Sequence, residues 1–147
     1  MTDAVLGTRT VFLEDVMMLS KLLLGAVAFA ALTLPAFAAG EPSDLKTMMI
    51  DGKTVITDAK GMTLYTFDND KAGEPSACSG KCAAAWPPAY ASAGATASGD
   101  FTLVKAADGK DMWAYDGMPL YGWVKDKKPG DTTGDMVGNV WHIAVEK

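Results

Sequence analysis

Residues 61–67 read GMTLYTF, and residues 117–123 read GMPLYGW, 56 positions further along the chain. The likeness continues downstream, where Trp86 follows the first stretch and Trp141 follows the second at nearly the same distance. Self-similarity at a fixed spacing is the sequence signature of a duplicated structural unit. We therefore predict that the chain contains two copies of one unit.

The two copies, called copy one and copy two below, occupy about residues 45–90 and 100–146 of the 147-residue chain. Residues 91–99 lie between them and alternate Ala with Ser, Gly or Thr, a composition typical of a linker. One domain is the natural count for a segment as long as residues 39–147. We expect that segment to form a single β domain with two internal repeats.

Each copy has the pattern of a three-stranded β-meander. Short apolar or β-branched runs alternate with turn residues, and no window of the segment after residue 38 has a clean helical stripe. Asp-Gly between two such runs predicts a hairpin with a type I′ turn, in which both central residues have positive φ. The predicted strands are 47–50, 53–57 and 62–67 in copy one and 101–105, 112–115 and 118–123 in copy two, with Asp-Gly turns at 51–52, 108–109 and 116–117.

The predicted fold class is all-β, with duplicated three-stranded meanders packed as a small sandwich or barrel-like domain. Alternation along the third strand of copy one places Leu64 on one face and Tyr65 and Phe67 on the other. Because both faces are apolar, we expect this strand to be covered on two sides, by the twin copy and by a loop. A short helical turn over residues 82–86, ended by two prolines, is the one helical element expected.

Both third strands end in the same Tyr-x-aromatic-x-x-Asp spacing. The Asp falls just beyond the strand, where a carboxylate can accept backbone N–H groups of the following turn. We expect both carboxylates to cap their turns, and we consider a second bond from a Tyr hydroxyl of the other copy. The motif residues are Tyr65, Phe67 and Asp70 in copy one and Tyr121, Trp123 and Asp126 in copy two.

With Cys78-x-x-x-Cys82, the Trp-Pro-Pro of residues 86–88 and the later Pro-Gly-Asp of residues 129–131, these motifs resemble the exported "secreted repeat of unknown function" family. That family is described as predicted lipoproteins with a Yx(F/W/Y)xxD motif, and the resemblance spans residues 51–145. It implies a fold and an exported location, and it implies no reaction. This chain departs from the lipoprotein pattern, since no cysteine lies near its N-terminal apolar run.

Cys78 and Cys82 are the only cysteines, and a pair in an exported chain most often forms a disulfide. Closing a loop of about five residues contributes on the order of 2 kcal/mol by the chain-entropy estimate. The alternative is a pair of thiolates, which select Cu(I). His142 and the methionines would complete such a site, so periplasmic copper handling is the alternative function.

Other chemistry finds little support in the sequence. His142 is the only histidine, and alternation places it on a solvent-facing edge of the last strand. The stretch from Asp68 lacks the acids that the calcium-loop template requires, because Ala72 and Ser79 stand at those positions. No motif for a nucleophile elbow, a zinc protease or a phosphate loop is present. We expect no catalysis, no metal and no cofactor.

The first 38 residues read as an N-terminal extension followed by a signal peptide. Lys21 precedes an apolar run over residues 22–37, and Ala-Phe-Ala at 36–38 matches a cleavage site. The run is shorter than the roughly 20 apolar residues of a membrane span, although a retained anchor is the alternative. Acidic residues within 1–16 do not fit a signal, so we expect translation to start at Met17 or Met18.

We therefore expect a periplasmic or secreted protein after cleavage near Ala38. The formal net charge is −5 and there is no basic run, which argues against nucleic acid and anionic membrane as partners. Membrane contact is expected only through the uncleaved signal, and the protein is expected to be a monomer. The predicted function is a non-catalytic binding or envelope-interaction module, with an unknown envelope or extracellular partner and an unknown ligand.

Overall fold

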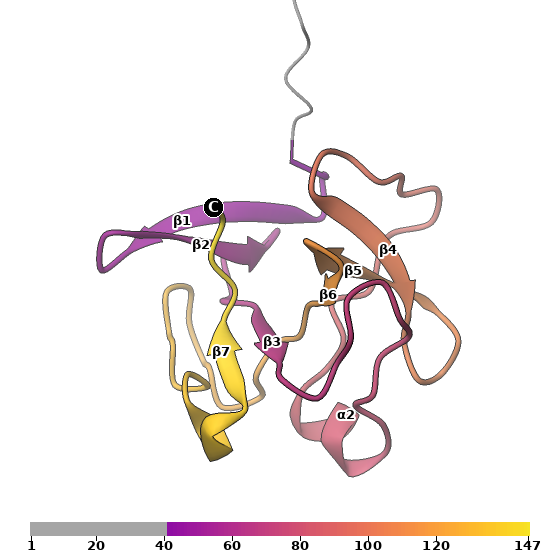
Figure 1. Cartoon of the computed structure of the whole chain (residues 1–147). Coiled ribbons are helices and arrows are strands. Elements are labelled where there is room, and N and C mark those ends of the chain that lie inside the picture. The colour runs from indigo at the N-terminus through magenta and orange to yellow at the C-terminus, as the bar shows by residue number, and fades with distance from the viewer. Residues whose placement is uncertain (1–40) are drawn as a thin grey trace, which may run out of the picture. The chain divides into compact units, whose positions relative to one another are not determined.

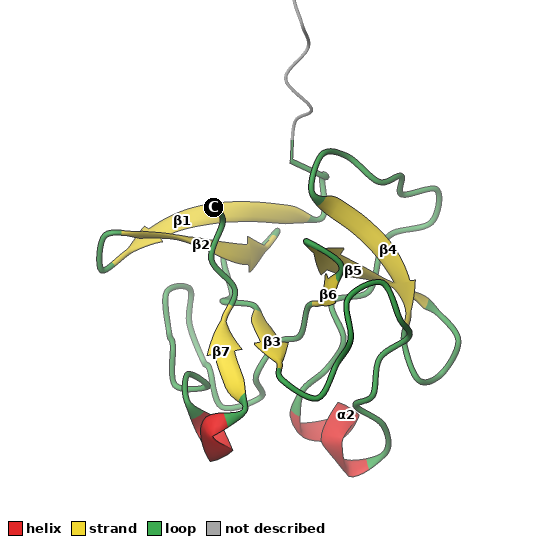
Figure 2. Ribbon diagram, in the orientation of Figure 1, coloured by secondary structure: helices red, strands yellow, loops and turns green. Residues whose placement is uncertain are grey.

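The computed structural model describes residues 41–147. The predicted extension, signal peptide, cleavage site and start at Met17 or Met18 all lie outside the described residues. Within residues 41–147 the structure is built from short antiparallel strands with almost no helix (Figures 1 and 2). The predicted all-β class with two repeats is confirmed, and the sheets do not close into a barrel.

Copy one begins with a β-hairpin. β1 (Leu45–Ile50) pairs antiparallel with β2 (Lys53–Asp58), and Ile50 lies opposite Lys53 across a two-residue turn. The central residues have φ values of 48° at Asp51 and 75° at Gly52. Positive φ at both positions is what a type I′ turn requires, so the predicted hairpin is confirmed.

Copy two forms the predicted meander. β4 (Phe101–Lys105), β5 (Asp111–Tyr115) and β6 (Met118–Pro119) make a three-stranded sheet in chain order. The turn from β5 to β6 has positive φ at both of its central residues, as predicted. The type I′ prediction is wrong for the turn from β4 to β5, where only Gly109 has positive φ because that connection is longer.

The third strand of copy one behaves differently from the predicted meander strand. A bridge joins Thr57 to Thr63, but β3 (Tyr65–Phe67) then leaves β2 and pairs antiparallel with β7 (Trp141–Ile143) of the other copy. Figure 1 shows β3 and β7 side by side. The three-stranded prediction therefore holds as a sheet only in copy two. In copy one, residues 62–64 keep two backbone hydrogen bonds to β2, and the cross-copy pairing begins at Tyr65.

The exchange is reciprocal and gives the two copies an approximate two-fold relationship. The amide of Tyr65 donates to the carbonyl of Tyr121 at 2.8 Å, and the amide of Tyr121 donates back to the carbonyl of Tyr65 at 2.9 Å. The closing segment of a copy is defined as residues 86–90 in copy one and 141–145 in copy two. Each third strand pairs with the closing segment of the other copy. Pro88 bridges Tyr121 just as β7 pairs with β3.

Alternation along the third strands feeds two separate hydrophobic cores. Leu64 and Leu120 enter one core, together with Trp113, while Tyr65 and Tyr121 enter the other. All four of these strand residues are at most 2% exposed. The expectation that the third strand is covered on both faces is confirmed.

The helical content consists of two short turns at matching positions. α2 (Lys81–Ala85) is the helical turn predicted before the Trp-Pro-Pro stretch, and the 3-10 turn η1 (Val137–Asn139) occupies the corresponding place in copy two. No helix among residues 41–147 is long and apolar enough to cross a membrane.

Candidate functional site

The centre of the domain is held by two buried Tyr–Asp hydrogen bonds that cross between the copies. The hydroxyl of Tyr65 donates to Oδ2 of Asp126 at 2.6 Å, and the hydroxyl of Tyr121 donates to Oδ2 of Asp70 at 2.6 Å. The two tyrosines are fully buried and the two carboxylates are 7% exposed or less. Each motif therefore supplies the donor to one pair and the acceptor to the other.

The second oxygen of each carboxylate caps the loop that follows it. Oδ1 of Asp70 accepts the amide of Ala77 at 2.8 Å, and Oδ1 of Asp126 accepts both the amide and the hydroxyl of Thr133, at 3.0 and 2.6 Å. These are the turn-cap and cross-copy bonds considered from the sequence. Burial raises the pKa of Asp70, and the bonds from Tyr121 and Ala77 offset part of that effect. Burial and the neighbouring carboxylates raise the pKa of both Tyr hydroxyls.

The aromatic residue of each motif ends a continuous stack of four rings. Phe67 stacks on Trp141 with 4.3 Å between ring centroids, Trp141 stacks on Trp86 at 3.8 Å, and Trp86 stacks on Trp123 at 3.9 Å. Successive rings come alternately from copy one and copy two. From either end, the order is a motif aromatic followed by the Trp of a closing segment. Such stacking adds to the stabilisation that burial provides. The motif aromatics thus have a structural role at the junction of the copies.

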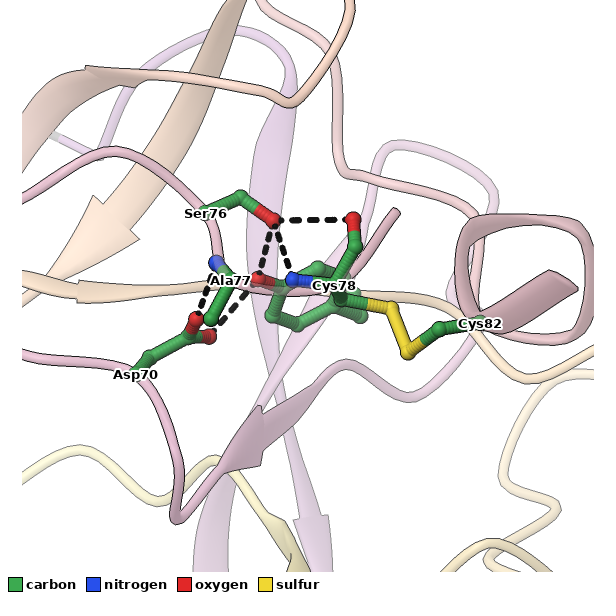
Figure 3. The surroundings of a disulfide bond; sticks show 6 residues. Asp70, Ser76, Ala77, Cys78 and Cys82 are labelled. Carbon is green, nitrogen blue, oxygen red and sulfur yellow. Dashed lines mark hydrogen bonds between the residues drawn. A yellow bond between two sulfur atoms is a disulfide. The ribbon is translucent and has the colours of Figure 1, made fainter. Parts of the chain in front are cut away.

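The predicted disulfide is present. Cys78 and Cys82 are bonded, with their Cα atoms 5.3 Å apart, and no free cysteine occurs among residues 41–147. Figure 3 shows the bond beside the Asp70 cap, where the hydroxyl of Ser76 accepts the amide of Cys78. The same hydroxyl lies 2.7 Å from that of Tyr121. The disulfide therefore constrains the loop that contacts the Tyr121–Asp70 pair.

The two Tyr–Asp pairs are buried, and they leave no room for a ligand. A cavity lies beside them. A cavity of about 340 Å³, called cavity one, is lined by residues of both copies, including Asp58, Thr63, Tyr90, Trp113 and Trp123. Its volume lies at the lower end of the range of ligand sites, which is roughly 300–1,000 Å³. The site that sequence reasoning missed is this one, because it forms only where the third strand of copy one meets the closing segment and the motif Trp.

Two polar atoms of residues that line cavity one have no hydrogen-bond partner within residues 41–147. They are the hydroxyl oxygen of Thr63 and the indole nitrogen of Trp123. An unpartnered buried polar group costs free energy, and in native proteins such groups are few. Both orphaned groups of the described structure therefore belong to residues that line one cavity, and both atoms are buried beneath its surface.

The carboxylate of Asp44 belongs to the same cavity and is held firmly. It accepts the amide and hydroxyl of Ser92 and, at 3.0 Å, the indole N–H of Trp113. The bonds from Ser92 lower the pKa of Asp44 below its usual value, so this carboxylate is charged at neutral pH. Among residues 41–147, no lysine, arginine or histidine lines cavity one.

His142 lies on β7 and is half-buried, at 37% side-chain exposure. Its Nε2 lies 3.0 Å from Oδ2 of Asp68, a partner that the sequence did not identify. Nowhere in residues 41–147 do three His, Cys, Asp or Glu side chains gather as a metal site would require. The bonded sulfurs of Cys78 and Cys82 are not thiolates, so nothing in the described structure supports the copper alternative.

Two interleaved copies joined by paired motifs define a duplicated all-β repeat protein. A family model described as "Secreted repeat of unknown function" matches residues 46–90 and 102–145. These matches cover more than half of the chain, so the chain belongs to that family, and the predicted family membership is confirmed. Searches of curated proteins and of solved structures give no match. A family described as secreted supports an exported location for this chain.

Proposed function

We propose that this domain is an exported, non-catalytic binding module and that cavity one is its ligand site. The observation that carries the proposal is the cavity wall. Its lining comes from both copies and includes the carboxylates of Asp44 and Asp58, and two of its residues, Thr63 and Trp123, each keep a buried polar atom without a partner within residues 41–147.

The surrounding structure supports a role in binding because it pre-organises the cavity. Its walls come from both copies, and the Tyr–Asp pairs and the ring stack fix the copies against each other. A rigid site loses little conformational entropy on binding. A non-catalytic role is supported by the carboxylates themselves, since both oxygens of Asp126 and Asp44 already accept protein hydrogen bonds.

The finer location belongs to the same proposal. We propose cleavage near Ala38 and release of a monomer into the periplasm or the medium, where the partner would be an envelope or extracellular component. The signal-like N-terminus and the family description support this. N-terminal sequencing of the exported protein tests it, and an intact residue 37 in the mature form would contradict cleavage.

The binding proposal is tested with amide chemical shifts. The isotope-labelled exported protein is titrated with a panel of small cations, anions, neutral polyols and apolar compounds. We expect at least one class to move the resonances of Thr63, Tyr90 and the Trp123 indole while leaving those of β4 unchanged. A panel that moves no resonance of the cavity lining would overturn the proposal.

A further inference from the structure

Cavity one has a counterpart in the other half of the domain. A second cavity of about 300 Å³, called cavity two, lies where the third strand of copy two meets the closing segment of its own copy. Six pairs of lining residues correspond through the duplication, namely Asp58 with Asp116, Met62 with Met118, Pro88 with Ile143, Ala89 with Ala144, Tyr90 with Val145, and Gly122 with Thr66. The duplication therefore produced two related cavities whose linings have since diverged.

Cavity two contains an ammonium group supplied by the protein. Nζ of Lys147 is hydrogen-bonded to Oδ2 of Asp116, which stands in the turn between β5 and β6, and both residues line the cavity. The amide of Lys147 also donates to the hydroxyl of Tyr115 at 3.0 Å. In cavity two, the carboxylate of the turn between β5 and β6 is therefore paired with a primary ammonium group.

In cavity one the corresponding turn, between β2 and the Thr63 bridge, carries Asp58, and this carboxylate forms no ion pair within residues 41–147. Its Oδ1 accepts the amides of Lys60 and Met62, at 2.8 and 2.9 Å. No such bond is made to its Oδ2 in the described part of the chain. The charged carboxylate of Asp44 stands on the same cavity.

We propose that cavity one binds a primary ammonium group of a small ligand or of a partner's side chain. This inference rests on the proposed binding function and names the chemistry of its ligand. The ammonium would pair with Asp58, as Lys147 pairs with Asp116, and it would donate to acceptors of the wall. The aromatic ring of Tyr90, which is exposed, suits a cation, since ring faces attract positive charge.

The described surroundings already show this attraction. The ammonium of Lys125 lies 5.5 Å from the ring centroid of Trp123, and that of Lys110 lies 5.3 Å from that of Tyr90. In the described part of the chain, three carboxylates and no basic residue line cavity one, which disfavours an anion. Nζ of Lys127 donates to the carbonyl of Val124 beside the cavity, so it is already engaged.

The test uses three probes of one shape and different charge: n-butylammonium, n-butanol and butyrate. Each is titrated into the labelled exported protein at low salt, because exposed ion pairs are screened. We expect n-butylammonium to shift the amides of Thr63 and Tyr90 and to bind at least fivefold more tightly than n-butanol. We expect no saturable shift with butyrate.

Two variants separate the cavities. Asp58→Asn keeps the Oδ1 that caps the turn and removes the charge, so n-butylammonium should bind about fivefold more weakly. Asp116→Asn is the matched control in cavity two and should leave that affinity unchanged. Lys147→Ala should free Asp116 and add a second saturable site, detected by new shifts at Met118 and Ile143.

The outcomes distinguish the two levels of the proposal. Tighter binding of n-butanol or butyrate at cavity one would overturn the ammonium inference while leaving a binding module. Binding of n-butylammonium that Asp58→Asn does not weaken would also overturn it, provided that the variant retains its wild-type melting temperature. If neither these probes nor the wider panel shifts the lining, the binding proposal itself fails.

Discussion

Tyr65 of copy one and Asp126 of copy two form a fully internal hydrogen bond of 2.6 Å, across 61 positions of sequence. Tyr121 and Asp70 form its mirror at the same distance. The pairing explains the spacing of the motif. The tyrosine reaches the other copy, and the aromatic residue two positions later joins the ring stack. The aspartate lies in the following turn, where it accepts the hydrogen bond of the partner tyrosine.

Removal of either hydroxyl should destabilise the whole domain. Tyr121→Phe leaves Oδ2 of Asp70 buried without its donor, and we expect a loss of about 1–3 kcal/mol in the free energy of unfolding, measured by urea denaturation. Tyr90→Phe is the control, because its bond to Asp108 is exposed, and it should stay within about 0.5 kcal/mol of wild type. Equal effects in the two variants would contradict a special role for the buried pair.

The disulfide constrains a loop of copy one, and its loss should destabilise the whole domain through the Asp70–Tyr121 pair. Cys78→Ser with Cys82→Ser removes a constraint worth on the order of 2 kcal/mol, because it frees the loop behind the Asp70 cap. Copy two holds the same loop with glycines at 134 and 138 and with an extra bond from the hydroxyl of Thr133.

Adding that hydroxyl to copy one should compensate in part. Ala77 corresponds to Thr133 and is exposed, so a Thr side chain has room there. In the Cys-free background we expect Ala77→Thr to recover about 0.5–1.5 kcal/mol, read from the same urea titration. No recovery would show that the loop of copy one depends on the disulfide in a way that a second cap bond cannot replace.

Gly134 is required for space. A Cβ atom at this position would lie 2.8 Å from Cζ of Tyr65 and 2.9 Å from Cη2 of Trp86. Gly134→Ala should therefore cost about 1–3 kcal/mol through overpacking. Gly122→Ala is the matched control, since its nearest neighbour would lie 3.9 Å away. Thermal unfolding measures both, and an unchanged melting temperature for Gly134→Ala would contradict the packing shown here.

The raised pKa of Asp70 predicts a specific pH dependence. Burial makes the folded protein hold this proton more tightly than the unfolded chain, whose carboxyl titrates near 3.8. More protons are then bound in the folded state, so the contribution of Asp70 to stability falls as the pH rises above that value. Relative to Asp70→Asn, wild type should lose stability between the two pKa values and level off above them. Denaturation from pH 3.5 to 7 measures this, and a wild type that gains stability relative to Asp70→Asn as the pH rises would refute it.

A single copy should not fold as a monomer. Residues 41–90 alone would lack the partners of Tyr65 and Asp70 and the strand that pairs with β3. We expect this fragment to be unfolded when dilute and to associate into a dimer when concentrated, as judged by light scattering and circular dichroism. A folded monomer would show that the exchange between copies is dispensable.

Local patterns of the sequence predicted much of this structure. The β1 and β2 hairpin, the meander of copy two, the helical turn before Trp86 and the disulfide all follow from turn residues, alternation and spacing. The pairing of β3 with β7 could not be predicted from the sequence. The backbone N–H and C=O groups of β3 would be equally satisfied by a strand of the same copy or of the other copy, so local patterns do not choose between them. The Asp68–His142 contact depends on that choice of partner, and cavity one needs residues from both copies, so local rules could not locate either.

The ring stack has an optical consequence. Trp86 and Trp141, one from each copy, lie nearly parallel, with an interplanar angle of 5° and 3.8 Å between centroids. Two indole chromophores this close share their electronic excitation, so they should give a paired signal of opposite signs in circular dichroism. The chain thus carries an intrinsic spectroscopic reporter of whether its two halves are joined, readable without any label.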